Sequence, residues 1–121
     1  YMSGDYCLLL IQWFIKMELV MQEMNKKISK KVLMAKARAT TTSIEKMDEK
    51  QRSSTASGEY GEDYNKLREL VAQMYPHLKE LLPPSVWTYE EGMSRFTQQS
   101  YGEIDTFCEQ IFQLLSEEDQ A

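Results

Sequence analysis

The chain has 121 residues, about the length of one domain, and its 42% hydrophobic content is enough for a modest buried core. Charged residues make up 27% and the mean hydropathy is -0.53, values that exclude both a predominantly membrane-embedded protein and a wholly disordered chain. The formal net charge of -5 is unevenly distributed. Residues 1–60 carry ten Lys and Arg against seven Asp and Glu, whereas residues 61–121 carry four against twelve.

The two cysteines, Cys7 and Cys108, lie far apart and form neither a CxxC motif nor a Cys/His spacing. This argues against a disulfide framework and against a zinc site, so we expect a reducing, intracellular location, either cytoplasm or nucleus. The sequence begins with Tyr1 instead of Met, and we therefore expect it to be a fragment of a longer protein.

A long first helix is predicted over about residues 6–38, within an amphipathic and apolar segment spanning residues 1–39. Its apolar residues recur every three or four positions, the spacing that places side chains on one helical face. They are Leu10, Phe14, Met17, Met21, Met24, Ile28, Val32 and Ala35. A basic run from Lys26 to Arg38, without any acidic residue, lies toward the end of this helix and complements the helix dipole.

Residues 40–62 read as a polar flexible linker. Three consecutive threonines follow Ala39, and the segment 53–61 is rich in serine and glycine. A short helix is possible near Ile44 and Met47, but these two residues alone offer little to bury.

Residues 63–121 are predicted to form an antiparallel helical hairpin. The first helix carries a coiled-coil-like pattern that continues past Pro76, where we expect a kink or a break followed by a further helical turn, with the kink favoured. The residues of the pattern are Tyr60, Tyr64, Leu67, Val71, Met74, Leu78 and Leu81. Pro83 and Pro84 mark the turn, and the capping-box spacing of Thr88 and Glu91 predicts the start of the second helix. With the long first helix, the predicted fold class is all-α, a helical bundle or a coiled-coil-like assembly.

Catalytic chemistry is poorly supported. His77 is the only histidine, and the predicted hairpin places it roughly 20 Å from Cys108, too far for a nucleophile–base pair. The carboxylates of the C-terminal half read as a solvated helix face, and no EF-hand, P-loop, GxGxxG or HExxH motif is present. We expect no enzyme activity and assign no catalytic residue, metal ligand, cofactor or small-molecule substrate.

Residues 7–15 differ from the rest of the first helix because apolar side chains surround the helix on all sides. A surface helix has one apolar face only, so these residues need cover on several sides. Three arrangements remain open: the segment is the centre of a bundle, an interface with a partner or a second copy, or a membrane-inserted helix.

The predicted function is that of a non-enzymatic helical protein–protein interaction or scaffold module in a larger intracellular assembly. It binds a protein partner or forms a homo-oligomer. Large aromatic residues and methionines dominate interface energetics. The candidate partner-binding residues are Trp13, Phe14, Met17, Met21, Met24, Trp87, Phe96, Phe107 and Phe112. One alternative is a membrane-associated regulatory helix that uses residues 7–31; a nucleic-acid-associated subunit is less favoured because the pI is about 4.9.

Overall fold

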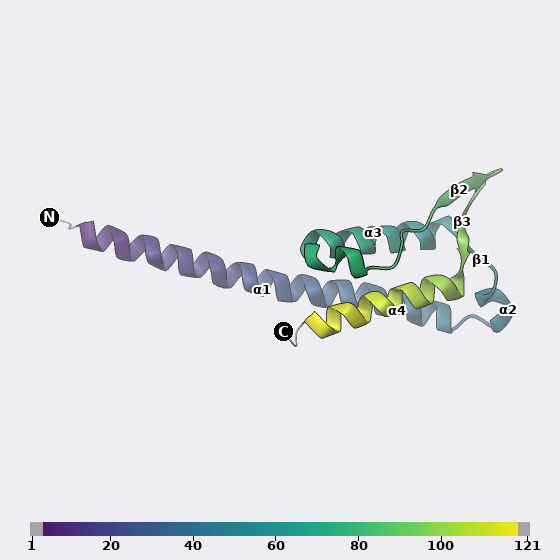
Figure 1. Ribbon diagram of the computed structural model, residues 1–121, viewed down its shortest axis with the longest axis horizontal. Helices are drawn as coiled ribbons and strands as arrows, with labels where there is room; N and C mark the ends of the chain where they lie inside the picture. The colour runs from purple at the N-terminus through teal and green to yellow at the C-terminus, as the bar shows by residue number, and fades with distance from the viewer. Residues whose placement is uncertain (1–3, 119–121) are drawn as a thin grey trace. The chain divides into compact units, whose positions relative to one another are not determined.

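The computed structural model describes the backbone of residues 4–118 and the side chains of residues 7–24 and 29–118. The protein is mostly helical and has a long N-terminal helix, as predicted. It also contains a three-stranded antiparallel sheet (Figure 1), so the fold is α+β and the all-α prediction is wrong. The chain divides into two compact units, Tyr1–Lys31 and Val32–Ala121.

Helix α1 comprises Gly4–Glu45 and continues well beyond residue 38, where the sequence pattern predicts its end. The threonines that suggested a break are accommodated inside the helix. The hydroxyl of Thr40 donates to the carbonyl of Lys36 at 3.1 Å, and that of Thr41 donates to the carbonyl of Arg38 at 2.9 Å. Thr41 and Ile44 are fully buried, so packing against the rest of the second unit offsets the low helix propensity of threonine.

The stretch predicted as a linker, residues 40–62, contains regular structure. It holds the end of α1, the short helix α2 (Glu49–Arg52), strand β1 (Thr55–Ser57) and the start of α3. Asp48 caps α2, because its Oδ1 accepts a hydrogen bond from the backbone N–H of Gln51 at 2.7 Å. Ala56 in β1 is fully buried. The small residues of this stretch therefore serve close packing as well as chain reversal.

Helix α3 (Gly58–Met74) buries Tyr64, Leu67 and Val71, which belong to the predicted apolar pattern. Pro76 does not kink this helix: α3 ends at Met74, and a 3₁₀ helix, η1 (Pro76–Leu81), begins at the proline. Proline lacks the N–H that would continue the α-helical bonds and disfavours helical geometry at the residue before it. Tyr75 accordingly has φ -127° and ψ 74°.

Two strands replace the first half of the second predicted helix. Strand β2 (Thr88–Glu91) pairs with β3 (Ser94–Ser100), and β1 pairs with the other side of β3, so the sheet order is β1-β3-β2. The two-residue loop begins at Gly92, whose φ of 65° suits the turn of a tight hairpin. The alternating aromatic and β-branched residues around this loop favour a strand over a helix.

Helix α4 (Tyr101–Glu117) begins directly after β3, where the hydroxyl of Ser100 accepts a hydrogen bond from the N–H of Glu103. It runs parallel to α3 (Figure 1), because Tyr101 lies against Tyr60 near both helix starts and Glu118 contacts His77 beyond both ends. The prediction of an antiparallel helical hairpin is therefore wrong. The segment before β2 runs back along α3, toward the start of α3. The β-hairpin then keeps the chain at that end, and α4 begins there.

The hydrophobic core of the second unit lies among α3, α4, the sheet and the C-terminal part of α1. Its central side chains come from positions at helical spacing on α4 and α3, and the loop before β2 adds two more. The buried apolar residues are Leu33, Ala37, Ile44, Ala56, Tyr64, Leu67, Val71, Tyr75, Leu78, Leu82, Val86, Ile104, Cys108, Ile111 and Leu115.

Candidate interaction surfaces

The first candidate surface is the exposed apolar segment, residues 7–24 of α1. Twelve large apolar side chains of this segment are between 43% and 65% exposed. They are Leu8, Leu9, Leu10, Ile11, Trp13, Phe14, Ile15, Met17, Leu19, Val20, Met21 and Met24. Such a continuous exposed apolar surface is unusual for a lone soluble chain and is typical of a site that contacts a protein or a membrane.

Five of the predicted partner-binding residues, Trp13, Phe14, Met17, Met21 and Met24, belong to this segment and all are exposed. The rings of Trp13 and Phe14 meet edge to face, with 5.3 Å between their centroids. Adjacent aromatic side chains on a helix point in different directions, so this pair widens the apolar surface beyond a single stripe.

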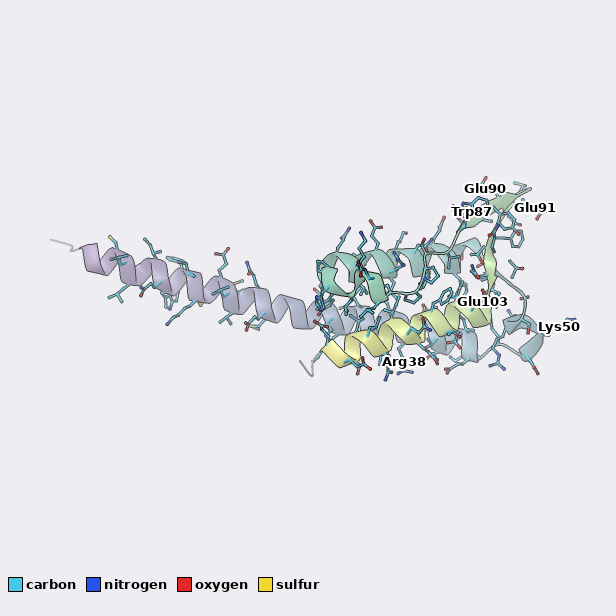
Figure 2. The ribbon with its side chains drawn as sticks, in the orientation of Figure 1. Arg38, Lys50, Trp87, Glu90, Glu91 and Glu103 are labelled. Carbon is cyan, nitrogen blue, oxygen red and sulfur yellow. The ribbon has the colours of Figure 1, made fainter. Side chains whose placement is uncertain are left out.

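The second candidate surface is the aromatic row of the β-hairpin, formed by Trp87, Tyr89 and Phe96. Trp87 stacks on Tyr89 with 6.1 Å between ring centroids, and Tyr89 lies at the same distance from Phe96, its partner in the strand register. Trp87 is 63% exposed, while the other two are half-buried. Figure 2 shows Trp87 beside Glu91 at this hairpin, whereas Glu90 belongs to the opposite face of β2 and contacts Arg95.

The opposite face of the hairpin packs on α3. A Cβ atom on Gly61 would meet the methyl groups of Thr97 and Thr88, which shows how closely the strands approach the helix. Successive side chains of a strand point to opposite faces, so the threonines face α3 while Tyr89 and Phe96 face away from it.

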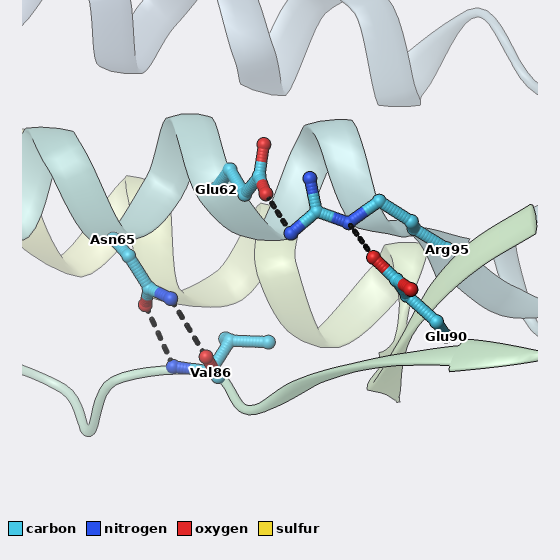
Figure 3. A network of polar contacts seen from close by, with 5 residues as sticks. All are labelled: Glu62, Asn65, Val86, Glu90 and Arg95. Carbon is cyan, nitrogen blue, oxygen red and sulfur yellow. Dashed lines mark hydrogen bonds and ion pairs between the residues drawn. The ribbon is translucent and has the colours of Figure 1, made fainter.

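Polar contacts fix the hairpin and the segment before it on α3 (Figure 3). The side-chain amide of Asn65 donates to the carbonyl of Val86 and accepts from its N–H, at 2.7 and 2.8 Å. Arg95 on β3 forms an ion pair with Glu62 on α3, and its Nε lies 3.7 Å from a carboxylate oxygen of Glu90. These contacts fix the backbone of Val86, the residue that precedes Trp87.

Phe107 and Phe112, also predicted as partner-binding residues, are half-buried and pack against the core. The ring of Phe107 lies 5.6 Å from that of Tyr64, and the guanidinium of Arg38 sits 4.1 Å above the ring of Phe112. The structure therefore separates the nine predicted residues: five lie on the exposed segment, two on the hairpin and two against the core.

Comparison with protein-family models, with curated proteins and with solved structures found no match. Within the described part of the chain, no helix combines the length and apolar character needed to cross a membrane.

Three carboxylates lie close together within the described residues. The carboxylates of Glu45, Asp105 and Glu109 offer oxygen atoms within 4.8 Å of one another, a separation at which a cation could be held. Burial, followed by the charges of Glu109 and Glu45, raises the pKa of Asp105, while Arg52 opposes this rise. Such mutual repulsion is also common at exposed acidic clusters that bind no ion, and these residues define no metal site by themselves.

The thiol of Cys108 lies in the core and is almost completely buried. Burial, with a smaller effect from Asp105, raises its pKa to about 12. Because the thiolate is the reactive form, this thiol is unsuited to nucleophilic chemistry near neutral pH. His77 contacts Glu118 at 2.7 Å, on an exposed part of the second unit.

Sequence reasoning missed Tyr89, which links Trp87 to Phe96. A usable signal was present: the aromatic and β-branched residues of 86–89 and 96–97 flank the glycine at position 92. The capping-box interpretation of Thr88 and Glu91 obscured it, because a Thr and a Glu three positions apart also occur in alternating strands.

Proposed function

We propose that this chain is a non-enzymatic protein-interaction or scaffold module and that it binds another protein through the exposed apolar segment, residues 7–24. One observation carries the proposal: the twelve large apolar side chains of that segment are about half exposed, on all sides of the helix. Removing such surface from water yields about 25 cal/mol for each Å² of apolar area, so a partner that covers the segment gains a large driving force.

The composition of the segment suits contact with another protein. Trp13 and Phe14 are large anchors of the type that dominates binding energies, and Met17, Met21 and Met24 have flexible side chains that adapt to the shape of a partner. Lys16 and Glu23 lie on the other side of the helix from these residues and keep that side compatible with water.

In-cell photo-crosslinking of the full chain tests the proposal. A photoreactive amino acid replaces Phe14, and in a control it replaces Glu103, an exposed residue of α4. We expect a discrete protein adduct from position 14 and none from position 103. Adding Met17→Asp should abolish the adduct, because a charge on the apolar face opposes its burial. An adduct that persists with Met17→Asp, or that fails to form, contradicts the proposal.

Binding to a membrane surface is the competing function, since apolar residues followed by lysines also fit an interfacial helix. Flotation with phosphatidylcholine vesicles, with and without phosphatidylserine, separates the two. Binding that requires phosphatidylserine, weakens with salt and depends on Trp13 would favour the membrane function. Absence of the chain from floating vesicles favours the protein-binding function.

A further inference from the structure

We infer that the partner of the exposed apolar segment is the same segment of a second copy, and that the two helices pair in antiparallel orientation. This inference rests on the proposed function and specifies its partner. A row of six residues along the helix would form the contact. These are Cys7, Leu10, Phe14, Met17, Met21 and Met24, and all six are exposed.

The spacing of this row is that of a coiled-coil seam. Steps of three and four residues alternate from Cys7 to Met24, which gives an average of 3.5 residues per turn. A row with this period stays in contact with a neighbouring helix through a slight left-handed supercoil, whereas a straight helix alone has a period of 3.6.

The row is also complementary to itself when one copy is reversed. In one antiparallel register Cys7 lies opposite Met24 of the second copy, Leu10 opposite its Met21, and Phe14 opposite its Met17. The same three contacts recur on the other side of a twofold axis, so every seam residue obtains a partner. Each large aromatic ring then meets a flexible methionine, and the pair of Phe14 residues does not collide at the centre.

Charge selects the antiparallel orientation. Three lysines follow the segment at positions 26, 27 and 31, without an acidic residue among them, and Lys30 of the same run is buried. Parallel copies would hold the two lysine runs side by side. In the antiparallel register the runs lie at opposite ends, about 30 Å or more apart at roughly 1.5 Å per residue, well beyond the screening length of about 8 Å in physiological salt.

The area of the seam is adequate for a stable pair. Trp13 and Val20 flank the six seam residues on one side and would also be covered. These eight side chains expose on the order of 100 Å² each, so covering all of that surface would bury at most about 800 Å² on each copy, which reaches the size of a standard protein interface.

A disulfide test fixes the orientation in the full-length protein. Met24→Cys adds a thiol opposite the natural Cys7 of a second copy, and oxygen with copper–phenanthroline removes two electrons and two protons for each bond formed. Within one helix the two positions lie about 26 Å apart, too far to bond. We expect Met24→Cys to give a covalent dimer whose peptides join positions 7 and 24, whereas the wild-type chain gives none and Leu19→Cys gives none.

Sedimentation of the purified chain gives a second readout. Phe14→Ala should weaken the dimer at least about tenfold, whereas Leu19→Ala, on the outer side of the helix, should leave its dissociation constant unchanged. A wild-type dimer joined through Cys7 of both copies would overturn the antiparallel pairing. A chain that stays monomeric in sedimentation yet forms the position-14 adduct with a different protein in cells would overturn self-association and leave the proposed function standing.

Discussion

The side-chain amide of Asn65 pairs with both backbone polar groups of Val86, donating to its carbonyl at 2.7 Å and accepting from its N–H at 2.8 Å. Val86 is buried, so its backbone has little access to water. One side chain thus provides a hydrogen-bond partner for both backbone polar groups of Val86.

Asn65→Ala is expected to lower the free energy of unfolding by about 1–3 kcal/mol, because two buried backbone groups lose their partner. Denaturant unfolding followed by circular dichroism measures the loss. Gln73→Ala on the exposed side of the same helix is the control and should stay within about 0.5 kcal/mol. Equal stability of the two variants would show that water satisfies the backbone of Val86.

Gly61→Ala is expected to destabilise the second unit by about 1–3 kcal/mol, because the new methyl group overlaps the methyl group of Thr97 and the site is already close-packed. Adding Thr97→Ser should recover part of the loss, since it removes that methyl group and keeps the hydroxyl. A double-mutant cycle of thermal unfolding measures the coupling. Gly102→Ala, where a Cβ would make only ordinary contacts, is the control and should be neutral or stabilising.

The raised pKa of Cys108, about 12 against the ordinary 9.0, predicts a pH dependence of stability. Below pH 9 the thiol is neutral in both the folded and the unfolded chain, and its contribution is fully present. As the pH rises above 9 the unfolded chain loses this proton while the folded chain keeps it, so stability falls. Cys108→Ala should flatten the unfolding free energy between pH 9 and 10. A slope unchanged by this substitution would assign the decline to other groups.

The same burial predicts slow modification of Cys108. In a Cys7→Ser chain at pH 8, we expect a thiol reagent to modify less than one equivalent until denaturant is added, and then to modify Cys108 completely. Cys108→Ser is the counterpart, in which exposed Cys7 should react without denaturant. Immediate modification of Cys108 in the folded chain would contradict its burial in the core.

Repulsion in the acidic cluster predicts a stabilising substitution. Asp105 and Glu109 lie four residues apart on α4, where like charges destabilise a helix by about 0.2–0.5 kcal/mol. Glu109→Gln should therefore raise the free energy of unfolding by about that amount at pH 7 and low salt. Glu103→Gln is a control of opposite sign, because a negative charge at the start of α4 favours the helix dipole. Urea unfolding of both variants measures whether each substitution raises or lowers the free energy of unfolding.

The pH dependence of this cluster follows from the raised pKa of Asp105. The contribution of Asp105 to the free energy of unfolding is fully present below pH 3.8, its ordinary pKa. It is lost as the pH rises through the raised pKa of this carboxyl in the folded chain. Glu109→Gln should reduce that loss. If stability rose with pH in this range and the variant did not change the slope, repulsion would not govern the cluster.

Helical periodicity predicted the parts of the fold in which local pattern and packing agree. The spacing of Tyr64, Leu67, Val71 and Leu78 identified residues that are buried in the core. It also identified the long first helix. That helix continues further than helix propensity alone predicts, because the burial of Thr41 and Ile44 stabilises its last turns.

The direction of α4 could not be derived in this way. Its parallel alignment with α3 depends on the contacts of Asn65 and Arg95 with segments 20 or more residues away, and no local pattern encodes those pairings. Composition singled out residues 7–15 as a segment that needs cover on several sides, but it left open whether that cover is a bundle core, a partner or a membrane. The aromatic row was not predicted, because it exists only once Tyr89 and Phe96 are aligned across two strands.

The sheet order places β2 at an edge, and in the described chain its only strand partner is β3. Open strand edges are templates for aggregation, and charged residues on them are a common protection. Glu90 and Glu91 occupy half of β2, and the side chain of Glu90 is 73% exposed. Two molecules that approached through this edge would bring their glutamates together at strand spacing. The edge is thereby guarded against fibre-like growth.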